Sequence, residues 1–300
     1  MGSNGKTRNS CQPNSRWYTG SGIYRDVNLF IGTELYVPKD RIRITTLSVQ
    51  DEIAVIEVCA DIKNITGTGT EAECTIEFCR EGKTVAKEVQ HVVFLQNTIE
   101  TIRVQIPVLK PEKWSPEHPN LYECRIQIKN GDTVCDVVTE HFGIRVLTLD
   151  PIRGFQINGE TVKFRGACIH HDNGIIGAET FAEAEWYRCK CLKEAGFNAL
   201  RSSHHPMSRT MLEACDRLGM LVMDELTDMW NRHKNPYDYA DIFQEQAGQW
   251  IEHMVAKDYN HPSVVMYSIG NEIPETGNRF DAAWGKKLAD KIRSLDDTRS

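Results

Sequence analysis

The 300-residue sequence contains no apolar run of about 18 residues, the length that a membrane-spanning helix requires. Its first ten residues, MGSNGKTRNS, lack the apolar core of a signal peptide. Basic residues are not in excess, because 35 Lys and Arg stand against 42 Asp and Glu, for a net charge of −7. A nucleic-acid-binding protein normally carries a basic patch or stripe. We therefore expect neither a membrane nor a nucleic acid as a partner.

Two kinds of local motif are also missing. The sequence has no G-x-G-x-x-G and no Walker motif, which argues against a nucleotide-binding fold. None of its ten cysteines forms a C-x-x-C pair, and Cys189 and Cys191 are only two residues apart. This pattern favours free thiols that act as small apolar side chains over zinc ligands or disulfides. Free thiols are typical of a reducing compartment, so we expect a cytoplasmic protein without a cofactor.

Apolar residues make up 40% of the chain, which is enough for real cores, and the length suggests two domains with a fragment of a third. Up to about residue 150 the pattern is β. Apolar and polar residues alternate with period two in residues 53–62, 74–78 and 122–128. Asn130-Gly131 between two such runs is a strong hairpin signal. This part of the chain predicts a small β-sandwich whose charged residues form solvated faces.

After residue 150 strand patterns and helix patterns alternate. A hairpin is expected at residues 155–165, where it runs into a strand, and further strands at 197–201, 220–224 and 263–269. Helices are expected at 179–195, 208–218, 243–257 and 281–295. The first helix would place Ala184, Tyr187, Cys191 and Ala195 on one face. Four βα units indicate a parallel sheet, either the N-terminal half of a (β/α)₈ barrel or a doubly wound sheet.

Chemistry-bearing residues follow the predicted strands: His170-His171-Asp172, His204-His205, Asp224-Glu225 and Asn271-Glu272. Active groups at the carboxyl ends of strands are the layout of a barrel enzyme. Glu272 follows a nearly all-apolar strand, and such surroundings suit a carboxyl group to general acid work. Asn271 could donate a hydrogen bond to substrate. The alternative for this pair is a helix cap or a surface ion pair.

His170 and His204 would lie near each other at the barrel mouth and could bind substrate hydroxyl groups. The alternative is that each is a core or loop histidine satisfied by backbone groups. Zinc ligands in barrels are usually spaced His-x-His, whereas His170 and His171 are adjacent and should point opposite ways. Helix capping and loop hydrogen bonding account for Asp224-Glu225 at least as well as catalysis does.

Five segments carry a family resemblance: residues 12–27, 164–172 (FRGACIHHD), 198–206 (NALRSSHHP), 213–225 and 260–272 (NHPSVVMYSIGNE). Together they resemble glycoside hydrolase family 2, which includes β-galactosidases, β-glucuronidases and β-mannosidases. The resemblance implies a remnant of a jelly-roll domain at residues 1–33, an immunoglobulin-like sandwich at 34–148 and the first four βα units of a TIM barrel at 149–300.

The resemblance also implies roles for single residues. Glu272 takes the place of the family's acid/base, Asn271 that of the residue that contacts the sugar 2-hydroxyl, and His204 and His170 those of substrate-binding histidines. The implied activity is that of a retaining exo-β-glycosidase acting on a small β-glycoside, β-galactosidase first and β-glucuronidase as the alternative. A non-catalytic carbohydrate-binding remnant is the alternative from another class.

Departures from the family pattern lead to further expectations. The family's nucleophile lies on the seventh barrel strand, so we expect it to be absent from this chain and the chain alone to be inactive or poorly soluble. Met229 and Asn231 occupy the positions of magnesium ligands in some relatives, and we expect no metal site. Arg16 stands near the position of a jelly-roll Asp that reaches the active site in relatives. The full-length form could assemble as a homo-oligomer.

Overall fold

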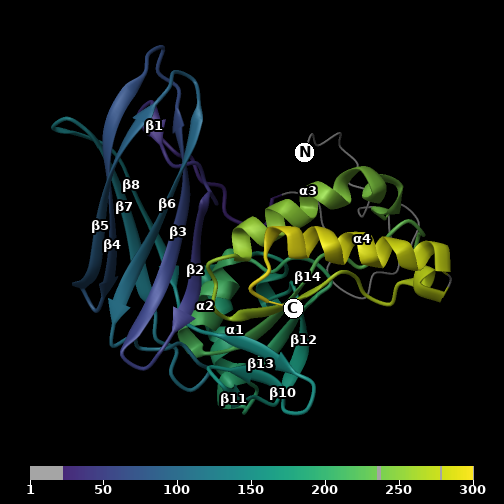
Figure 1. Cartoon of the computed structure of the whole chain (residues 1–300). Helices are drawn as coiled ribbons and strands as arrows, with labels where there is room; N and C mark the ends of the chain where they lie inside the picture. Colours follow the sequence, from purple (N-terminus) through teal and green to yellow (C-terminus); the bar gives the residue numbers. More distant parts are fainter. Residues whose placement is uncertain (1–22, 235–237, 278, 300) are drawn as a thin grey trace. The chain divides into compact units, whose positions relative to one another are not determined.

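A computed structural model describes residues 23–234, 238–277 and 279–299 (Figure 1). Contacts divide the chain into two compact units. The sandwich unit comprises Asn28–Lys163 and Tyr259–Pro262, and the barrel unit comprises Phe164–Asp258 and Ser263–Ser300 together with the N-terminal residues as far as Val27. Most of the predicted jelly-roll remnant, Arg16 included, lies outside the described residues.

The sandwich unit contains two antiparallel sheets that share one core (Figure 1). In the first sheet β3 pairs with three strands, and the members are β1 (Leu35–Tyr36), β2 (Ile42–Val49), β3 (Ile53–Asn64) and β6 (Ile99–Leu109). The second sheet has the order β5-β4-β7-β8, with bounds Lys83–Phe94, Thr70–Arg80, Tyr122–Asn130 and Thr133–Phe142. This arrangement confirms the predicted sandwich.

Period-two burial builds the core of this unit. Every second residue of β3 is buried, and β6 and β7 repeat the pattern over most of their length. The buried side chains of the two sheets meet in one cluster that includes Ile56, Ile76, Phe78 and Ile126, all without exposed surface. The predicted hairpin is also confirmed, because Asn130 pairs with Thr133 across a two-residue loop that begins at Gly131.

A small sheet of order β11-β10-β9 completes the sandwich unit, with bounds Glu160–Thr161, Gly154–Ile157 and Leu147–Asp150. It contains the hairpin predicted around Asn158-Gly159. The segment Tyr259–Pro262 also belongs to this unit. The side chain of Asn260 extends the edge of β2, because its Oδ1 accepts from Ile44 N and its Nδ2 donates to Ile42 O, each at 2.9 Å. The Asn of the NHP sequence is therefore a structural residue.

The barrel unit is built on a parallel sheet of order β12-β13-β14-β15, with bounds Gly166–His170, Ala199–Ser203, Leu221–Glu225 and Val264–Ser268. The helices are α1 (Ala182–Glu194), α2 (Arg209–Leu218), α3 (Ala240–Asp258) and α4 (Arg279–Leu295), with short 3₁₀ turns η1 (Gly174–Ile176) and η2 (Pro274–Gly277). The strands follow one another in chain order, whereas a doubly wound sheet reverses its order. No helix in the described ranges is both long and apolar enough to cross a membrane.

Helix α2 begins and ends where its sequence predicts. The Oγ of Ser208 accepts a hydrogen bond from Met211 N at 3.2 Å and so satisfies one of the free N–H groups of the first turn. At the other end Gly219 has a φ of +68°, the left-handed conformation that ends many helices. These two residues confirm the predicted bounds to within one residue.

The face of α1 that the sequence analysis singled out is not the face that the helix buries. Tyr187 and Cys191 are exposed, and the fully buried positions are instead Glu185 and Cys189. Cys189 contacts Cys215 of α2 through their Sγ atoms at 3.8 Å, whereas Glu185 accepts hydrogen bonds from its neighbours. A search for apolar periodicity cannot find a face that contains a paired carboxylate, because such a side chain counts as polar.

We predict that Gly143→Ala destabilises the sandwich unit by about 1–3 kcal/mol, the usual cost of overpacking. A Cβ atom at Gly143 would lie 2.8 Å from the Cβ atoms of both Pro262 and Trp114. Chemical denaturation followed by tryptophan fluorescence measures the change. The matched control is Gly67→Ala in the same unit, where nothing lies within 4 Å and no loss is expected. Equal stability of the two variants would contradict the prediction.

Candidate active site

The strand ends of the barrel unit gather the predicted site residues at one edge of the parallel sheet. His170 is the last residue of β12, His204 directly follows β13, Glu225 ends β14, and Asn271 comes three residues after the end of β15. Because the strands are parallel and in register, these ends lie side by side.

Glu225 is the most highly connected residue at this edge. Its side chain has no exposed surface. Its Oε2 accepts from Arg201 Nε at 3.0 Å, Arg201 Nη2 at 2.5 Å and Ser268 Oγ at 2.6 Å, while its Oε1 lies 2.5 Å from His204 Nδ1. A buried charge requires such partners, because the cost of removing it from water is otherwise not offset.

Asn271 is held by the same network. Its Oδ1 accepts from Arg201 Nη2 at 3.1 Å and its Nδ2 donates to Asp228 Oδ1 at 2.9 Å. Lys234 Nζ donates to the same Asp228 oxygen at 2.9 Å and to the backbone carbonyl of Asn271 at 2.5 Å. These contacts determine which end of the amide faces which neighbour, and Asn271 is 94% buried.

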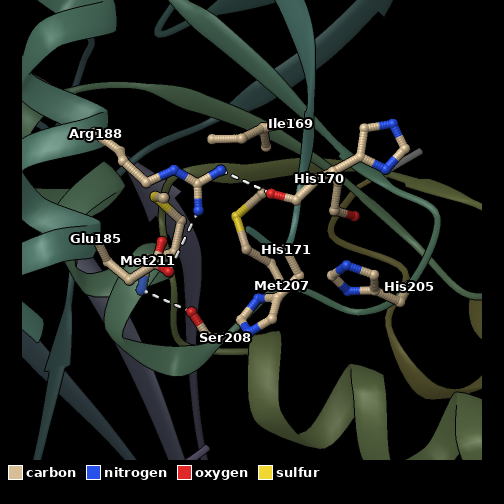
Figure 2. Close-up of a pocket in the computed structure, with 10 residues that line it drawn as sticks. Ile169, His170, His171, Glu185, Arg188, His205, Met207, Ser208 and Met211 are labelled. Carbon is tan, nitrogen blue, oxygen red and sulfur yellow. Dashed lines mark hydrogen bonds and ion pairs between the residues drawn. The ribbon is translucent and has the colours of Figure 1, made fainter. Parts of the chain in front are cut away.

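The four histidines form two separate pairs. His170 meets His204 edge-on with ring centroids 5.4 Å apart, and His171 meets His205 at 5.5 Å. Figure 2 shows the rings of His170 and His171 pointing in different directions. The expectation that adjacent histidines diverge is therefore confirmed, as is the expected proximity of His170 and His204.

The pair His171–His205 borders a small pocket on the other side of the strand ends (Figure 2). Arg188 of α1 crosses this pocket and donates to the carbonyl oxygen of His170 at 2.7 Å. The residues that line it are Ile169, His170, His171, Glu185, Arg188, Ser202, His205, Met207, Ser208 and Met211. The ion pair between Arg188 and Glu185 and the side chains of Met207 and Met211 line this pocket. We therefore interpret it as a packing feature rather than a sugar site.

Burial keeps both histidines of this second pair neutral. Desolvation, helped by the nearby Arg25, lowers the pKa of His171 to about 3. Desolvation also lowers the pKa of His205 to about 4, against a backbone hydrogen bond that raises it. Nδ1 of His205 donates to Pro206 O at 3.0 Å, so the neutral ring carries its proton there.

The acidic pair Asp224-Glu225 at the end of β14 is divided between two environments. Asp224 has no exposed surface, and its Oδ1 accepts from Ser202 Oγ at 2.7 Å and from Met207 N at 2.8 Å. Burial raises its pKa, but the Lys257 ammonium and these hydrogen bonds outweigh burial and leave the pKa lowered. Burial raises the pKa of neighbouring Asp258 well above its usual range. Neither Asp224 nor Glu225 caps a helix, so the capping interpretation is wrong, whereas loop hydrogen bonding holds for Asp224.

Glu272 is exposed, directly after the buried Asn271. Its φ is +44°, a left-handed conformation that non-glycine residues adopt rarely. Such outliers are common at functional sites, where the surrounding structure holds them in place. Glu272 is thus an exposed residue that directly follows Asn271, a member of the network of Glu225 and Arg201.

In the loop after β14, Met229 and Asn231 occupy the positions of the magnesium ligands of some relatives. Thr227 Oγ1 contacts Met229 Sδ at 3.6 Å, and a thioether is a poor ligand for magnesium. Across the part of the chain that the structure describes, no three His, Cys, Asp or Glu side chains converge as a metal site requires. The absence of a metal site stays a prediction.

Sequence analysis missed three members of the network, Arg201, Asp228 and Lys234, and it considered helix capping or loop hydrogen bonding at least as likely as catalysis for Glu225. Arg201 lies within the RSSHHP segment and Glu225 ends an apolar strand, so both carried a signal. A charged residue inside a strand that is otherwise apolar needs a partner of opposite charge. Applied to Arg201 and Glu225, this argument would have predicted that the two side chains form an ion pair.

Comparison with known families agrees with this geometry. The model described as "Glycosyl hydrolases family 2" matches residues 36–145, and the model described as "Glycosyl hydrolases family 2, TIM barrel domain" matches residues 152–300. The chain belongs to glycoside hydrolase family 2. Family 2 membership confirms the predicted order of domains, a sandwich followed by part of a TIM barrel.

Individual members of family 2 are similar over nearly the whole chain. A β-galactosidase of Bacteroides ovatus, BoGH2A, is 37% identical over 276 residues, which cover 89% of this chain and 32% of the relative. A putative β-glucuronidase of Formosa agariphila is 33% identical, over 93% of this chain and 26% of the relative. The crystal structure of a family 2 member from Bacteroides cellulosilyticus has a TM-score of 0.92 at 39% identity and covers 95% of this chain and 37% of that one. The chain thus spans about a third of the length of these relatives.

We predict that acidification destabilises the barrel unit through His205. The ordinary imidazole pKa is about 6.5, whereas the folded value is about 4. The unfolded chain binds more protons between these values, so this contribution to stability is present above about pH 6.5 and is lost as the pH falls.

His205→Gln should remove this dependence. Between pH 7 and pH 4, the free energy of unfolding of the variant should fall by roughly 3 kcal/mol less than that of the wild type. Urea unfolding at several pH values measures the difference. The control is His141→Gln, whose imidazole is 47% exposed in the sandwich unit. Wild type and His205→Gln with parallel pH curves would show that His205 does not carry the effect.

Proposed function

We propose that this chain carries the acid/base side of the active site of a retaining exo-β-glycosidase, with Glu272 as the general acid/base. The observation that supports the proposal best is the contrast between Glu272 and its surroundings. Its carboxylate is exposed at the sheet edge, whereas Asn271 beside it is buried and oriented by hydrogen bonds. An exposed proton donor next to oriented hydrogen-bonding groups suits catalysis on a polyhydroxylated substrate.

In the proposed reaction Glu272 protonates the leaving glycosidic oxygen while a second carboxylate attacks the anomeric carbon and forms a glycosyl-enzyme intermediate. Glu272 then removes a proton from the water that hydrolyses this intermediate. His204, His170 and Asn271 bind sugar hydroxyl groups throughout. The edge contact between the His170 and His204 rings, whose centroids are 5.4 Å apart, supports a shared role in binding one substrate.

Glu225 does not fit the role of the second carboxylate. Both of its oxygens are occupied, by Arg201 and Ser268 on one side and by His204 on the other, and its side chain has no exposed surface. A nucleophile needs an accessible oxygen about 5 Å from the acid. The family resemblance puts the nucleophile on a later barrel strand than β15.

For the sugar we propose a β-galactoside, with a β-glucuronide as the second candidate. BoGH2A, at 37% identity, is named a β-galactosidase, and the Formosa agariphila relative, at 33%, is named a putative β-glucuronidase. A glucuronide carries a carboxylate, and recognition of that group requires a cationic partner at the far end of the sugar. The oriented groups described above bind hydroxyls equally well in both sugars.

A non-catalytic carbohydrate-binding protein is the competing proposal from another class. The same assay separates the two: aryl β-galactoside, β-glucuronide and β-mannoside are offered to the 300-residue chain and to the chain extended along its reading frame where that frame continues. Turnover of one sugar by either form supports the enzyme and identifies its substrate. Sugar binding without turnover by both forms supports the binding protein.

We predict that Glu272→Gln slows turnover of the active form at least about a hundredfold, the usual contribution of a general acid/base. Gln has nearly the same shape but cannot donate a carboxyl proton. The loss should be smaller for an aryl glycoside whose leaving group needs no protonation. Glu213→Gln, at an exposed position of α2, makes the same change of charge away from the site and should leave the rate unchanged. A rate equal to wild type in Glu272→Gln would assign the acid role to another residue.

A further inference from the structure

The network at the sheet edge has one residue at its centre to which the family resemblance assigned no role. Glu225 has no exposed surface, yet it carries a carboxylate. Arg201 is the partner of opposite charge that a buried carboxylate requires, because its guanidinium is always charged and donates twice to Oε2. Ser268 Oγ adds a third hydrogen bond to the same oxygen at 2.6 Å.

The carboxylate of Glu225, paired with a guanidinium, accepts hydrogen bonds and donates none. Its other oxygen, Oε1, lies 2.5 Å from His204 Nδ1, so that nitrogen must carry a proton. In a neutral imidazole only one nitrogen is protonated, and a proton on Nδ1 leaves Nε2 as an acceptor. The position of Glu225 therefore selects the tautomer of His204.

The same carboxylate acts on Asn271 through one intermediate residue. Because Oε2 of Glu225 holds the plane of the Arg201 guanidinium, Nη2 of Arg201 is directed at Asn271 Oδ1, 3.1 Å away. The amide of Asn271 is then fixed with its NH₂ group towards Asp228. Two side chains that the proposed function places on the substrate thus take their orientation from Glu225.

We propose that Glu225 is a positioning residue that fixes the proton of His204 on Nδ1 and that orients Asn271 through Arg201. The role in sugar binding rests on the proposed function, whereas the tautomer of His204 does not. Glu225 itself touches no substrate, because its side chain is buried and both oxygens are occupied.

Glu225→Gln tests the proposal because its amide has one acceptor and one donor end. The site of Oε2 receives three hydrogen bonds from Arg201 and Ser268, so the amide oxygen takes this place. The NH₂ group then faces His204 Nδ1, which has to become an acceptor. The variant therefore moves the proton of His204 from Nδ1 to Nε2.

The measurement is long-range ¹H–¹⁵N NMR of the imidazoles in the ¹⁵N-histidine-labelled chain at about pH 8, where an ordinary imidazole is neutral. His204→Gln identifies the His204 signals. We expect protonated Nδ1 in wild type and protonated Nε2 in Glu225→Gln. A merely structural role of Glu225 would not reverse the tautomer.

The matched control is Asp241→Asn, which alters the exposed histidine–carboxylate contact at His233. It should change the signals of His233 and leave those of His204 in place. Wild-type His204 with an unprotonated Nδ1 would overturn the proposal, and this result does not depend on whether Glu225→Gln folds. A folded Glu225→Gln that keeps the proton on Nδ1 would overturn it as well.

The test is separate from that of the glycosidase activity. If the tautomer reverses as expected and no sugar is hydrolysed, Glu225 remains a positioning residue and the proposed function fails. In an active form, Glu225→Gln should raise KM several-fold in addition to any fall in kcat, because His204 and Asn271 bind substrate. Glu272→Gln should act mainly on kcat, so the two residues are distinguished by kinetics too.

Discussion

The buried ion pair between Arg201 and Glu225 is the constraint on which the candidate site depends. A carboxylate without contact to water is stable only where several donors surround it, and these donors come from different strands. Arg201 lies on β13, Glu225 on β14 and Ser268 on β15, where Ser268 is the direct neighbour of Glu225 in the strand pairing. The register of the parallel sheet therefore decides whether the charge is satisfied. A shift of β15 by one residue would turn Ser268 to the opposite face and remove one of the bonds to Oε2.

Alternation along the strands explains why the chemistry-bearing residues occur as adjacent pairs. Neighbours in a strand point to opposite faces. In the pair Asp224-Glu225, Glu225 joins Arg201 while Asp224 bonds to Ser202 on the other face. The histidine pairs divide similarly, with His170 and His204 together and His171 and His205 together. These three sequence pairs thus each supply one residue to the site and one to the packing behind it, where burial lowers the pKa of His171 to about 3.

Local signals in the sequence predicted most of the fold, because strand alternation, hairpin turns and helix caps act over a few residues. Ser208 and Gly219 delimit α2 as predicted, and Asn130-Gly131 marks a real hairpin. The prediction failed where stability comes from partners distant in sequence. The face of α1 was misassigned because Glu185 is buried through hydrogen bonds, and Glu225 was undervalued because its partners lie 21, 24 and 43 residues away. The roles of Glu272 and Asn271 came from the family resemblance, since spacing alone also fits a helix cap.

The proposed function gives the two glutamates at this sheet edge different roles, because a carboxylate that is fully held by hydrogen bonds is not available for proton transfer. Both oxygens of Glu225 have hydrogen-bond partners, Arg201 and Ser268 on Oε2 and His204 on Oε1. Its buried side chain therefore holds neighbouring groups in place and offers no oxygen to a substrate. Glu272 is exposed and held in a left-handed backbone conformation beside the buried Asn271, so its oxygens can meet a leaving group. General acid catalysis needs a proton that can move, whereas substrate orientation needs protons that cannot. In the proposed function, the buried Glu225 at the end of β14 and the exposed Glu272, four residues after β15, each meet one of these two requirements.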